Sequence, residues 1–316
     1  MDTSNTLNLR LTAVRYVARD THAFEFSSPD GRPLPDAEPG AHVTLSLPNG
    51  LSRQYSLVHA GRAPNHYEVG VKRDPHSRGG SQYMHESLQV GTLLPVTPPH
   101  NNFPLREDAT LSVFFAGGIG VTPMVAMLER LAALGKHSTL YYACRAREDA
   151  AFLPELTSIC DLHLHFDQEH QGRVLDMATL IAPLSRDAHL YCCGPGPMLA
   201  AFEAATADWP REQVHVEYFT AREAANTSGG YTVELARSGR EFQIPAGKSI
   251  LQVLREAGMT VASSCEEGVC AVCETGVLAG VPDHRDAILS EAERASNRTM
   301  MICCSGSKSE RLVLDL

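Results

Sequence analysis

The sequence lacks the features that define several classes of protein. Its first eleven residues, Met1 to Leu11, are polar and hold no apolar stretch of the kind a secretory signal needs. Basic residues are too few for a surface that binds phosphate backbones, since 27 Lys and Arg stand against 37 Asp and Glu, a formal net charge of −10. No internal repeat or low-complexity tract is present. We therefore expect no nucleic-acid partner and a cytoplasmic location.

Charge is also absent from one long stretch, Ala109–Leu128, which is long enough to cross a bilayer. Its centre, however, contains Gly117, Gly118, Gly120 and Pro123. These residues divide the stretch into a buried strand, a tight turn and the beginning of a helix. The sequence therefore predicts no membrane association.

The 316 residues suggest two or three domains at about 150 residues or fewer each. Leu9–Val14 and Ala41–Leu47 alternate apolar and polar residues between Gly- and Pro-containing turns, which is typical of a small antiparallel β-barrel. From about residue 107, apolar strands alternate with helices, which indicates a parallel α/β sheet. A polar segment, Ala221–Gly230, follows as a linker. The predicted domains are 1–106, 107–222 and 229–316.

In the second domain, the expected strands are Leu111–Ala116, Thr139–Ala143 and His189–Cys193, and the expected helices are Met124–Leu134 and Pro197–Ala207. In the third domain, a hairpin leads into a helix and a cysteine-rich loop, and the chain ends on a strand. The third-domain elements are Tyr231–Leu235, Glu241–Ile244, Ser249–Ala257 and Leu312–Leu316.

The strongest motif is Cys265-x4-Cys270-x2-Cys273, followed at a distance by Cys303. This is the plant-type [2Fe–2S] spacing, in which three thiolates wrap the cluster on one loop and a fourth is expected to arrive from a distant strand. Gly268 allows the close backbone approach that such a loop needs. A zinc site would prefer a second C-x2-C pair, which the sequence lacks. Cys304 adjoins Cys303, and we take Cys303 as the ligand.

Two turns of the second domain have the character of nucleotide-binding segments. Gly117–Pro123 follows an apolar strand and opens a helix, where free amides can hold phosphate. It does not match G-x-G-x-x-G, and a simple strand-to-helix turn would look the same. Cys193 ends another strand of this domain, at the sheet edge where ligands bind in open α/β sheets. Its neighbour Cys192 is interpreted as a core residue.

Two further motifs lie in the first domain, and each is weak alone. Arg53-Gln-Tyr-Ser-Leu57 supplies a guanidinium that can hold phosphate in two hydrogen bonds, and an aromatic face for a ring system. Arg78-Gly-Gly-Ser81 could bind phosphate through backbone amides and a hydroxyl.

Taken together and in this order, these motifs resemble the phthalate dioxygenase reductase family over the whole chain. That family includes the reductase components of vanillate O-demethylase and carnitine monooxygenase. The runs Gly280–Asp286 and Cys303–Ser309 are especially similar to that group. The resemblance implies a multidomain protein: an antiparallel β-barrel flavin domain, an α/β open parallel-sheet NAD domain and a β-grasp plant-type ferredoxin domain.

The resemblance also implies site residues. Ser56, Cys193 and Phe219 would be catalytic, with Cys193 close to the nicotinamide and Phe219 shielding the flavin face. Gly118, Gly120 and Thr122 would contact the nicotinamide nucleotide. The cluster ligands would be Cys265, Cys270, Cys273 and Cys303. FMN would be held by Arg53, Tyr55, Ser56, Val71, Lys72, Arg73, Gly79, Gly80 and Ser81.

The implied activity is a relay from NADH through FMN and the [2Fe–2S] cluster to a Rieske-type oxygenase that demethylates or hydroxylates a small organic substrate. A flavin is required because nicotinamide delivers electrons in pairs and the cluster accepts them singly. An alternative is an FAD-containing NADPH reductase that serves another one-electron acceptor. Arg145 or Arg147, at the end of the second α/β strand, could bind the 2′-phosphate of NADPH.

Two other classes of function stay open. An enzyme that oxygenates its substrate itself needs an open metal site such as two His and a carboxylate. His163 and His165 alternate as on a strand face, which favours a structural role. A passive ferredoxin-like carrier fused to a binding module would not need the flavin and nicotinamide motifs.

The sequence departs from the resembling family between Cys270 and Cys273. Ala271 and Val272 stand where that family usually has Gly and a small hydroxylated residue. Ligation by the cysteines is unaffected, whereas the hydrogen bonds to the cluster, and with them its potential, are in doubt.

Overall fold

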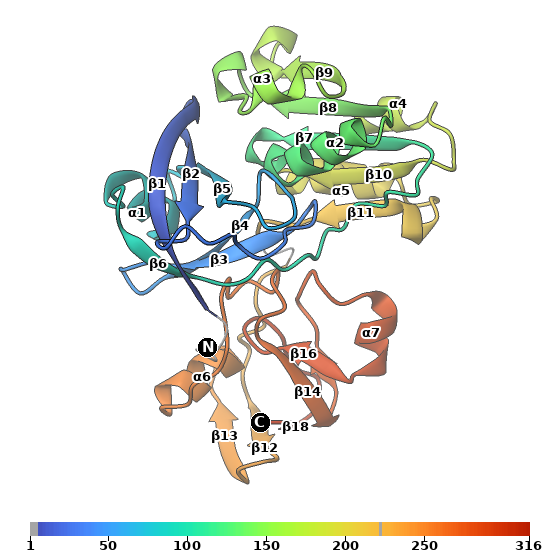
Figure 1. The fold of residues 1–316 in the computed structure, drawn as a ribbon. Helices are drawn as coiled ribbons and strands as arrows, with labels where there is room; N and C mark the ends of the chain where they lie inside the picture. The colour runs from blue at the N-terminus through green and yellow to red at the C-terminus, as the bar shows by residue number, and fades with distance from the viewer. Residues whose placement is uncertain (1–5, 221–222) are drawn as a thin grey trace. The chain divides into compact units, whose positions relative to one another are not determined.

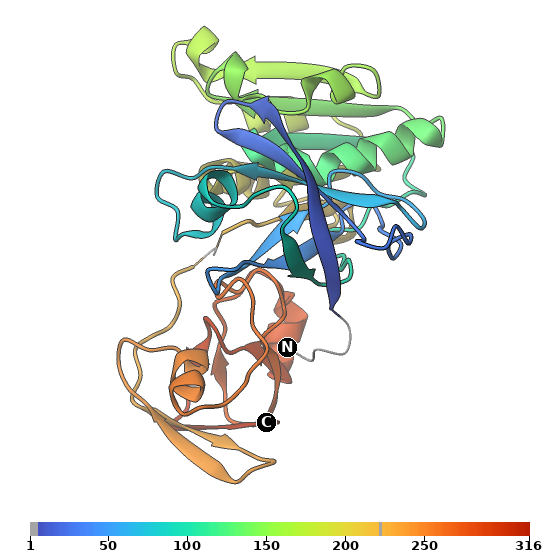
Figure 2. The same ribbon diagram turned by 60° about the vertical axis from the view of Figure 1, so that its left-hand side comes forward.

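The computed structural model describes residues 6–220 and 223–316 and divides into two compact units (Figures 1 and 2). One unit extends to Glu217, and the other runs from Tyr218 to Leu316. The predicted first and second domains lie together in the first unit. The predicted linker begins at Ala221, which together with Arg222 lies outside the described residues. The bounds of the three predicted domains therefore stay predictions.

The first half of the first unit is an antiparallel barrel of six strands in the order β4-β3-β6-β1-β2-β5. A bridge between Leu57, just after β4, and Val69 of β5 connects the two ends of this sheet. Alternation places Phe24 and Phe26 of β2 in the barrel core, both almost completely buried. The elements are β1 (Leu7–Ala18), β2 (Thr21–Ser27), β3 (His42–Ser46), β4 (Ser52–Ser56), β5 (His66–Lys72), α1 (Gly80–Glu86) and β6 (Leu93–Val96).

The second half is a fully parallel sheet of five strands in the order β11-β10-β7-β8-β9. The chain starts at β7 in the middle, builds outward to β8 and β9, and then crosses to β10 and β11. The strand order therefore reverses between β7 and β10, which is where such sheets bind ligands. The strands are β7 (Ser112–Gly117), β8 (Ser138–Cys144), β9 (Asp161–Phe166), β10 (His189–Cys193) and β11 (Val214–Glu217).

Helices cover both faces of this sheet because β7 is apolar on both sides. Phe114 shares a buried cluster with Val125 and Leu128 of α2, whereas its neighbour Phe115 lies 5.5 Å, ring to ring, from Phe202 of α5. The helical segments are η2 (Gly118–Val121), α2 (Thr122–Ala133), η3 (Arg147–Asp149), α3 (Leu153–Leu156), η4 (Asp167–His170), α4 (Met177–Ile181), α5 (Gly196–Ala205) and η5 (Arg211–Gln213).

The uncharged stretch 109–128 forms β7, η2 and the first part of α2, as its glycines predict. Gly118 turns the chain with a φ of +53°, and Pro123 lies in the first turn of α2, where its missing amide costs nothing. Among the described residues, no helix combines the length and the apolar character needed to span a bilayer.

The second unit contains a mixed sheet in the order β13-β12-β18-β14-β16, with β12 and β18 parallel. Helix α6 begins with a capping box in which Ser249 and Gln252 exchange side-chain to backbone hydrogen bonds. Its elements are β12 (Tyr231–Leu235), β13 (Arg240–Ile244), α6 (Ile250–Glu256), β14 (Glu274–Ala279), β15 (Pro282–Asp283), α7 (Glu291–Ser296), β16 (Thr299–Met301), β17 (Gly306–Ser307) and β18 (Arg311–Leu314).

Part of the predicted linker packs against this second unit. The Asn226 amide N–H donates to the carbonyl of Cys304 at 2.7 Å, and its side chain donates to Asp283 at 2.6 Å. Gly247 N–H donates to the carbonyl of Thr227. The segment from residue 226 onward therefore belongs to the folded unit, because its polar groups are already bonded there.

Polar pairs join the barrel to the parallel sheet within the first unit. Arg19, directly after β1, holds the buried carboxylate of Asp149 through two hydrogen bonds of 2.9 Å. His59 Nδ1 lies 2.9 Å from the Glu129 carboxylate of α2. This hydrogen bond is the main cause that raises the pKa of His59, with Glu68 and Glu155 adding to it.

We expect Glu129→Gln to remove a pH-dependent part of the stability of this unit. Because the pKa of His59 is raised, the contribution of the pair is fully present below about pH 6.5 and is lost as pH rises through the raised value. At pH 6 the variant should unfold in urea with about 0.5 kcal/mol less stability, and the difference should disappear by pH 9. Fluorescence of Trp209, the single tryptophan, reports the transition.

The matched control is Glu107→Gln, because Glu107 pairs with Arg130 at 2.8 Å and no imidazole is involved. Its effect should be the same at both pH values. Equal pH profiles for the two variants would contradict the assignment to His59.

Candidate functional site

The four cysteines of the predicted cluster motif come together in the second unit. The Sγ of Cys265 lies within hydrogen-bond contact of the thiols of Cys270 and Cys303, and Cys303 also contacts Cys273. Backbone amides of Glu267 and Val269 donate to Cys265 Sγ at 3.3 and 3.5 Å. Such amide donors stabilise thiolate charge on a ligand sulfur.

The donor set fits a cluster of two irons. Hydrogen bonds from neighbouring thiols lower the pKa of Cys265 and Cys273 and raise the pKa of Cys270 and Cys303. Four thiolates at this spacing can coexist only if cations replace the shared protons.

Gly268 lets the cluster loop fold against its surroundings. Its φ is +71°, and a Cβ there would lie 2.4 Å from Cys304 Sγ and 2.9 Å from the Cα of Asp286. Its carbonyl accepts the amide of Ala287 at 2.9 Å. Cys303 lies in the turn after β16 rather than in a strand, because the chain must turn there to bring its thiol to the loop.

The departure at Ala271 has a structural cost. Ala271 has a φ of +59°, in the left-handed region that glycine occupies without penalty. The glycine usual at this position in the resembling family would adopt this conformation without strain, whereas Ala271 adopts it at a cost in free energy.

The predicted phosphate-binding residues of the barrel also meet. Arg53 on β4 donates to the carbonyl of Arg78 at 3.2 Å, and a Cβ on Gly80 would lie 2.4 Å from Arg53 Nε. Gly79 has a φ of +89° and precedes α1. Ser81 Oγ lies 3.0 Å from Ser77 Oγ. A guanidinium, a turn and a hydroxyl are thus assembled at one place, as phosphate binding requires.

The strand predicted to line the flavin ring is β5 with the residue that follows it. Val71 is buried, whereas Lys72 and Arg73 are exposed. Arg73 pairs with Glu86 of α1 at 3.0 Å, and the His85 ring lies 2.9 Å from the carbonyl of Val71. These contacts fasten α1 to β5. Tyr55, also assigned to the flavin, is partly buried against the barrel core.

Gly118, Gly120 and Thr122 form the turn between β7 and α2. A Cβ on Gly120 would lie 2.3 Å from the carbonyl oxygen of Cys193, so the two loops at the switch point approach as closely as backbones can. Thr122 Oγ1 donates to the carbonyl of Ile119 at 2.9 Å. The glycine turn and the end of β10 therefore form one edge.

At this edge, the structure brings Ser56 and Cys193 together around Glu217. Ser56 Oγ lies 3.5 Å from Glu217 Oε2, and the Cys193 thiol also donates to this carboxyl group. Residues 193 and 217 are direct partners in the parallel pairing of β10 with β11. Burial raises the pKa of Glu217 to about 8, so the carboxyl group is largely protonated near neutral pH.

Glu217 is the site residue that the motif analysis missed. The sequence motifs assign Phe219 a role but give none to Glu217, two residues earlier. The structure places it at the end of β11, a strand that was not predicted, and strand ends of this kind form the ligand-binding edge. Phe219 is 37% exposed and belongs to the unit that begins at Tyr218.

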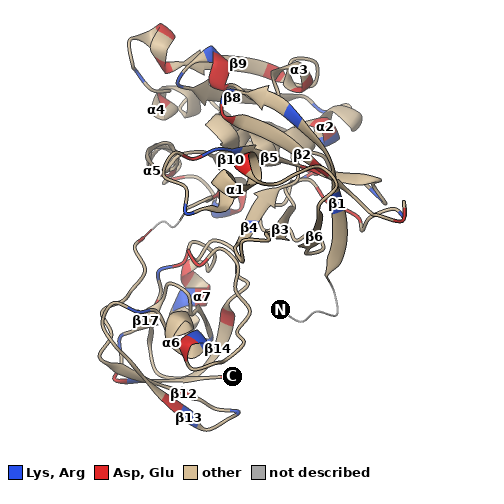
Figure 3. Ribbon diagram, turned by 90° about the vertical axis from the view of Figure 1, so that its left-hand side faces the viewer, with Lys and Arg blue, Asp and Glu red and all other residues tan. Residues whose placement is uncertain are grey.

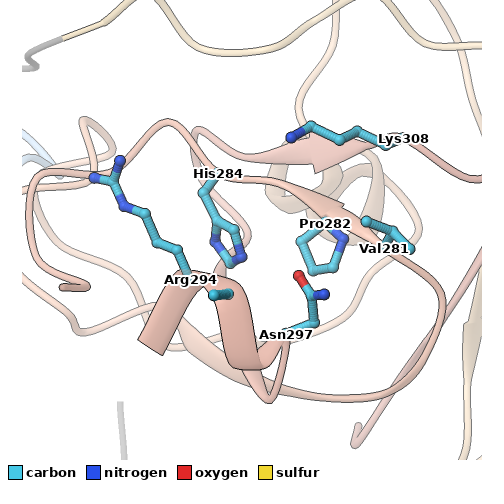
Figure 4. A pocket seen from close by; sticks show the side chains of 7 residues that line it. Val281, Pro282, His284, Arg294, Asn297 and Lys308 are labelled. Carbon is cyan, nitrogen blue, oxygen red and sulfur yellow. The ribbon is translucent and has the colours of Figure 1, made fainter. Parts of the chain in front are cut away.

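A separate cleft of about 370 Å³ lies in the second unit (Figure 4). The side chain of His284 is only 8% exposed; its Nδ1 lies 3.8 Å from Asp286 Oδ1, and neither ring nitrogen has a hydrogen-bond partner among the described residues. Beside it are Arg294 and Asn297, from α7 and the residue after it. None of the predicted site residues lines this cleft. The lining residues are Val281, Pro282, His284, Arg294, Ala295, Asn297 and Lys308.

Two family models match this chain, one over the cysteine loop and one over the parallel sheet. Residues 233–307 match the 2Fe-2S iron-sulfur cluster binding domain, and this range contains all four cysteines. Residues 114–204 match the oxidoreductase NAD-binding domain, which includes the glycine turn and Cys193.

Similarity to curated proteins extends over the whole chain. The chain is 50% identical to the phenoxybenzoate dioxygenase subunit beta of Ectopseudomonas oleovorans, covering 98% of this chain and 97% of that one. It is 40% identical to the phthalate dioxygenase reductase of Burkholderia cepacia, with the same coverage. The chain belongs to the phthalate dioxygenase reductase family.

Solved structures agree. A phthalate dioxygenase reductase, described as a modular structure for electron transfer from pyridine nucleotides to [2Fe–2S], is 40% identical with a TM-score of 0.75 and 98% coverage of both chains. An intact type IV self-sufficient cytochrome P450 monooxygenase is 36% identical, with a TM-score of 0.86, over 98% of this chain and 41% of that one. The barrel, the parallel sheet and the ferredoxin domain predicted from sequence are confirmed.

The chain is therefore an NADH-dependent flavin and iron–sulfur oxidoreductase. Its cofactors are FMN and a [2Fe–2S] cluster, with NADH as the electron donor, as predicted. Because the chain belongs to this reductase family, it is neither a passive ferredoxin-like carrier nor an enzyme that oxygenates its own substrate. The roles of individual residues stay predictions.

We expect Ala271→Gly to stabilise the cluster loop. Glycine adopts the left-handed conformation without penalty, and the gain is about 1 kcal/mol. In urea, the iron–sulfur absorbance should then decay about fivefold more slowly. Ala292→Gly, at an ordinary helical position in α7, serves as the control and should not slow the decay. Equal or faster decay in Ala271→Gly would contradict the strain.

Proposed function

We propose that this chain is the reductase component of a two-component system and passes single electrons to a Rieske-type oxygenase that hydroxylates or demethylates a small organic substrate. The observation that carries the proposal is the convergence of two assemblies in one chain: the four-cysteine loop and the Ser56, Cys193 and Glu217 edge. When bound, FMN supplies the step from paired to single electrons, and the cluster carries one electron at a time.

The barrel residues would bind and orient the flavin. Arg53, the turn at Gly79 and Gly80, and the Ser81 hydroxyl would hold the terminal phosphate. Tyr55 and the segment Val71–Arg73 would line the ring. A site of this kind for one terminal phosphate would suit FMN, whose phosphate ends the ribityl chain.

The parallel sheet would present the nicotinamide to the flavin. Gly118, Gly120 and Thr122 would bind the nucleotide at the edge where Gly120 touches the backbone of Cys193. Ser56 and Cys193 would contact the reacting ring. Glu217 would hold both side chains in place by accepting their hydrogen bonds. Phe219 would shield the flavin face.

The partner class is supported by the relatives, several of which are components of dioxygenase or demethylase systems. The chain's net charge of −10 would favour encounter with a basic patch on an oxygenase. A cytoplasmic location is supported by the five cysteines outside the cluster set, none of which forms a disulfide among the described residues, because free thiols persist in a reducing compartment.

A cysteine variant tests the electron route. Cys273→Ser should lower NADH-dependent reduction of cytochrome c at least tenfold, because that acceptor draws on the cluster. Reduction of ferricyanide, which the flavin can serve directly, should persist. Cys160→Ser, outside the loop, should leave both rates unchanged. A second experiment tests the partner by adding purified oxygenase. With a Rieske-type oxygenase, NADH should drive formation of the oxygenated product. If no Rieske-type oxygenase gives product, that partner class is rejected.

We expect the pH profile of NADH-to-ferricyanide turnover to depend on Glu217. With its pKa raised to about 8, the carboxyl is neutral below that pH and becomes a carboxylate above it. The buried negative charge would oppose the arrival of a hydride at this edge, so wild-type turnover should fall through pH 8, whereas Glu217→Gln should give a flat profile from pH 6 to 9. Glu217→Ala should lose turnover at least tenfold, because Ser56 and Cys193 lose their acceptor.

The same linkage has a stability consequence. A carboxyl whose pKa is raised by folding favours the folded state below its ordinary pKa near 4.5, and this advantage is lost as pH rises toward 8. Unfolding of Glu217→Gln should lack this pH dependence. An unchanged pH profile in both measurements would show that Glu217 does not titrate as described.

A further inference from the structure

The strand order of the parallel sheet locates the adenosine end of a bound nicotinamide nucleotide. The glycine turn follows β7, and the chain then builds outward through β8 and β9. In doubly wound sheets with this order, the ribose 2′ position lies beyond the end of the second strand, where an acidic residue or an Arg meets it. Here that place is the edge formed by the turns after Cys144 of β8 and Phe166 of β9.

An ion pair occupies this edge. Arg147 of η3 lies 3.2 Å from one carboxylate oxygen of Glu169 in η4 and 3.5 Å from the other. The guanidinium carbon also lies 4.6 Å from the centre of the Phe166 ring. The backbone amide of Gln168 donates to the carbonyl of Arg145 at 3.0 Å, which joins the two turns. Figure 3 shows acidic and basic positions next to each other around β9.

The Arg147–Glu169 pair favours a ribose 2′-hydroxyl over a 2′-phosphate at this edge. A 2′-phosphate would need the Arg147 guanidinium, but that group already pairs with Glu169 and stacks on Phe166. The phosphate would also have to approach the Glu169 carboxylate, with a second carboxylate, Asp167, in the same turn. A 2′-hydroxyl, by contrast, can donate a hydrogen bond to a carboxylate.

We propose that Glu169 is the residue that makes this chain select NADH over NADPH, by holding Arg147 and presenting a carboxylate to the ribose 2′ position. The proposal rests on nucleotide binding by the parallel-sheet domain, and it assigns opposite effects to two side chains that form one pair. Arg147, one of two arginines that could have favoured NADPH, is thereby prevented from doing so.

The turnover test is Glu169→Gln, assayed with ferricyanide so that neither the cluster nor a partner is needed. The ratio of kcat/KM for NADPH to that for NADH should rise about tenfold, which corresponds to about 1.4 kcal/mol. Glu107→Gln is the matched control, since it also removes the carboxylate from an Arg pair in the same unit. Its ratio should equal that of the wild type. An unchanged ratio in Glu169→Gln overturns the proposal.

A binding test separates this inference from the redox function. Adenosine 2′,5′-bisphosphate should bind the flavin-loaded Glu169→Gln protein about tenfold more tightly than the wild type by calorimetry, and adenosine 5′-monophosphate should not. Adding Arg147→Ala should abolish the gain. A gain that survives without Arg147 overturns the proposal. Failure of NADH turnover in the wild type would reject the function and leave the bisphosphate result to decide the specificity.

Discussion

The organisation of the second unit depends on how four thiol groups are kept close enough to share two irons. The four thiols interact with one another, which lowers the pKa of Cys265 and Cys273 and raises the pKa of Cys270 and Cys303. As thiolates they would repel one another, and the loop backbone must hold them together. Gly268 and the amides around Cys265 contribute to this, and Ala271 accepts a conformation that costs energy. The site is thus built to be completed by metal.

The first unit must bind the flavin and the nicotinamide nucleotide side by side. The barrel contributes Ser56, and the parallel sheet contributes Cys193 and Glu217, so the contact among them exists only when the two halves are packed together. Arg19 and His59 hold the halves in that arrangement from positions outside the predicted site. Stability and chemistry are therefore coupled through the packing between barrel and sheet.

Much of this could be predicted from the sequence, for reasons that differ by region. The cysteine spacing identifies its ligands because three of them lie on one loop, so chain geometry fixes their neighbours. The central strands β7 and β10 were found because buried parallel strands are continuously apolar, whereas no strand was predicted at β11. Glu217 was missed because its role depends on its contact with Cys193, which lies 24 residues earlier in the chain. Only the pairing of β10 with β11 shows that the two residues are neighbours. The Arg147 and Glu169 pair was hidden for the same reason, since its members follow different strands.

The short strand β4 carries both Arg53 and Ser56, one for the predicted phosphate site and one for the edge with Glu217. Its alignment with β3 is set by five consecutive partners, from His42 with Ser56 to Ser46 with Ser52. Because side chains alternate between the two faces of a strand, a slip of one residue would turn both groups to the wrong side together. The hairpin between β3 and β4 is thus where a single insertion or deletion does the most damage, and its length is under tighter constraint than its composition.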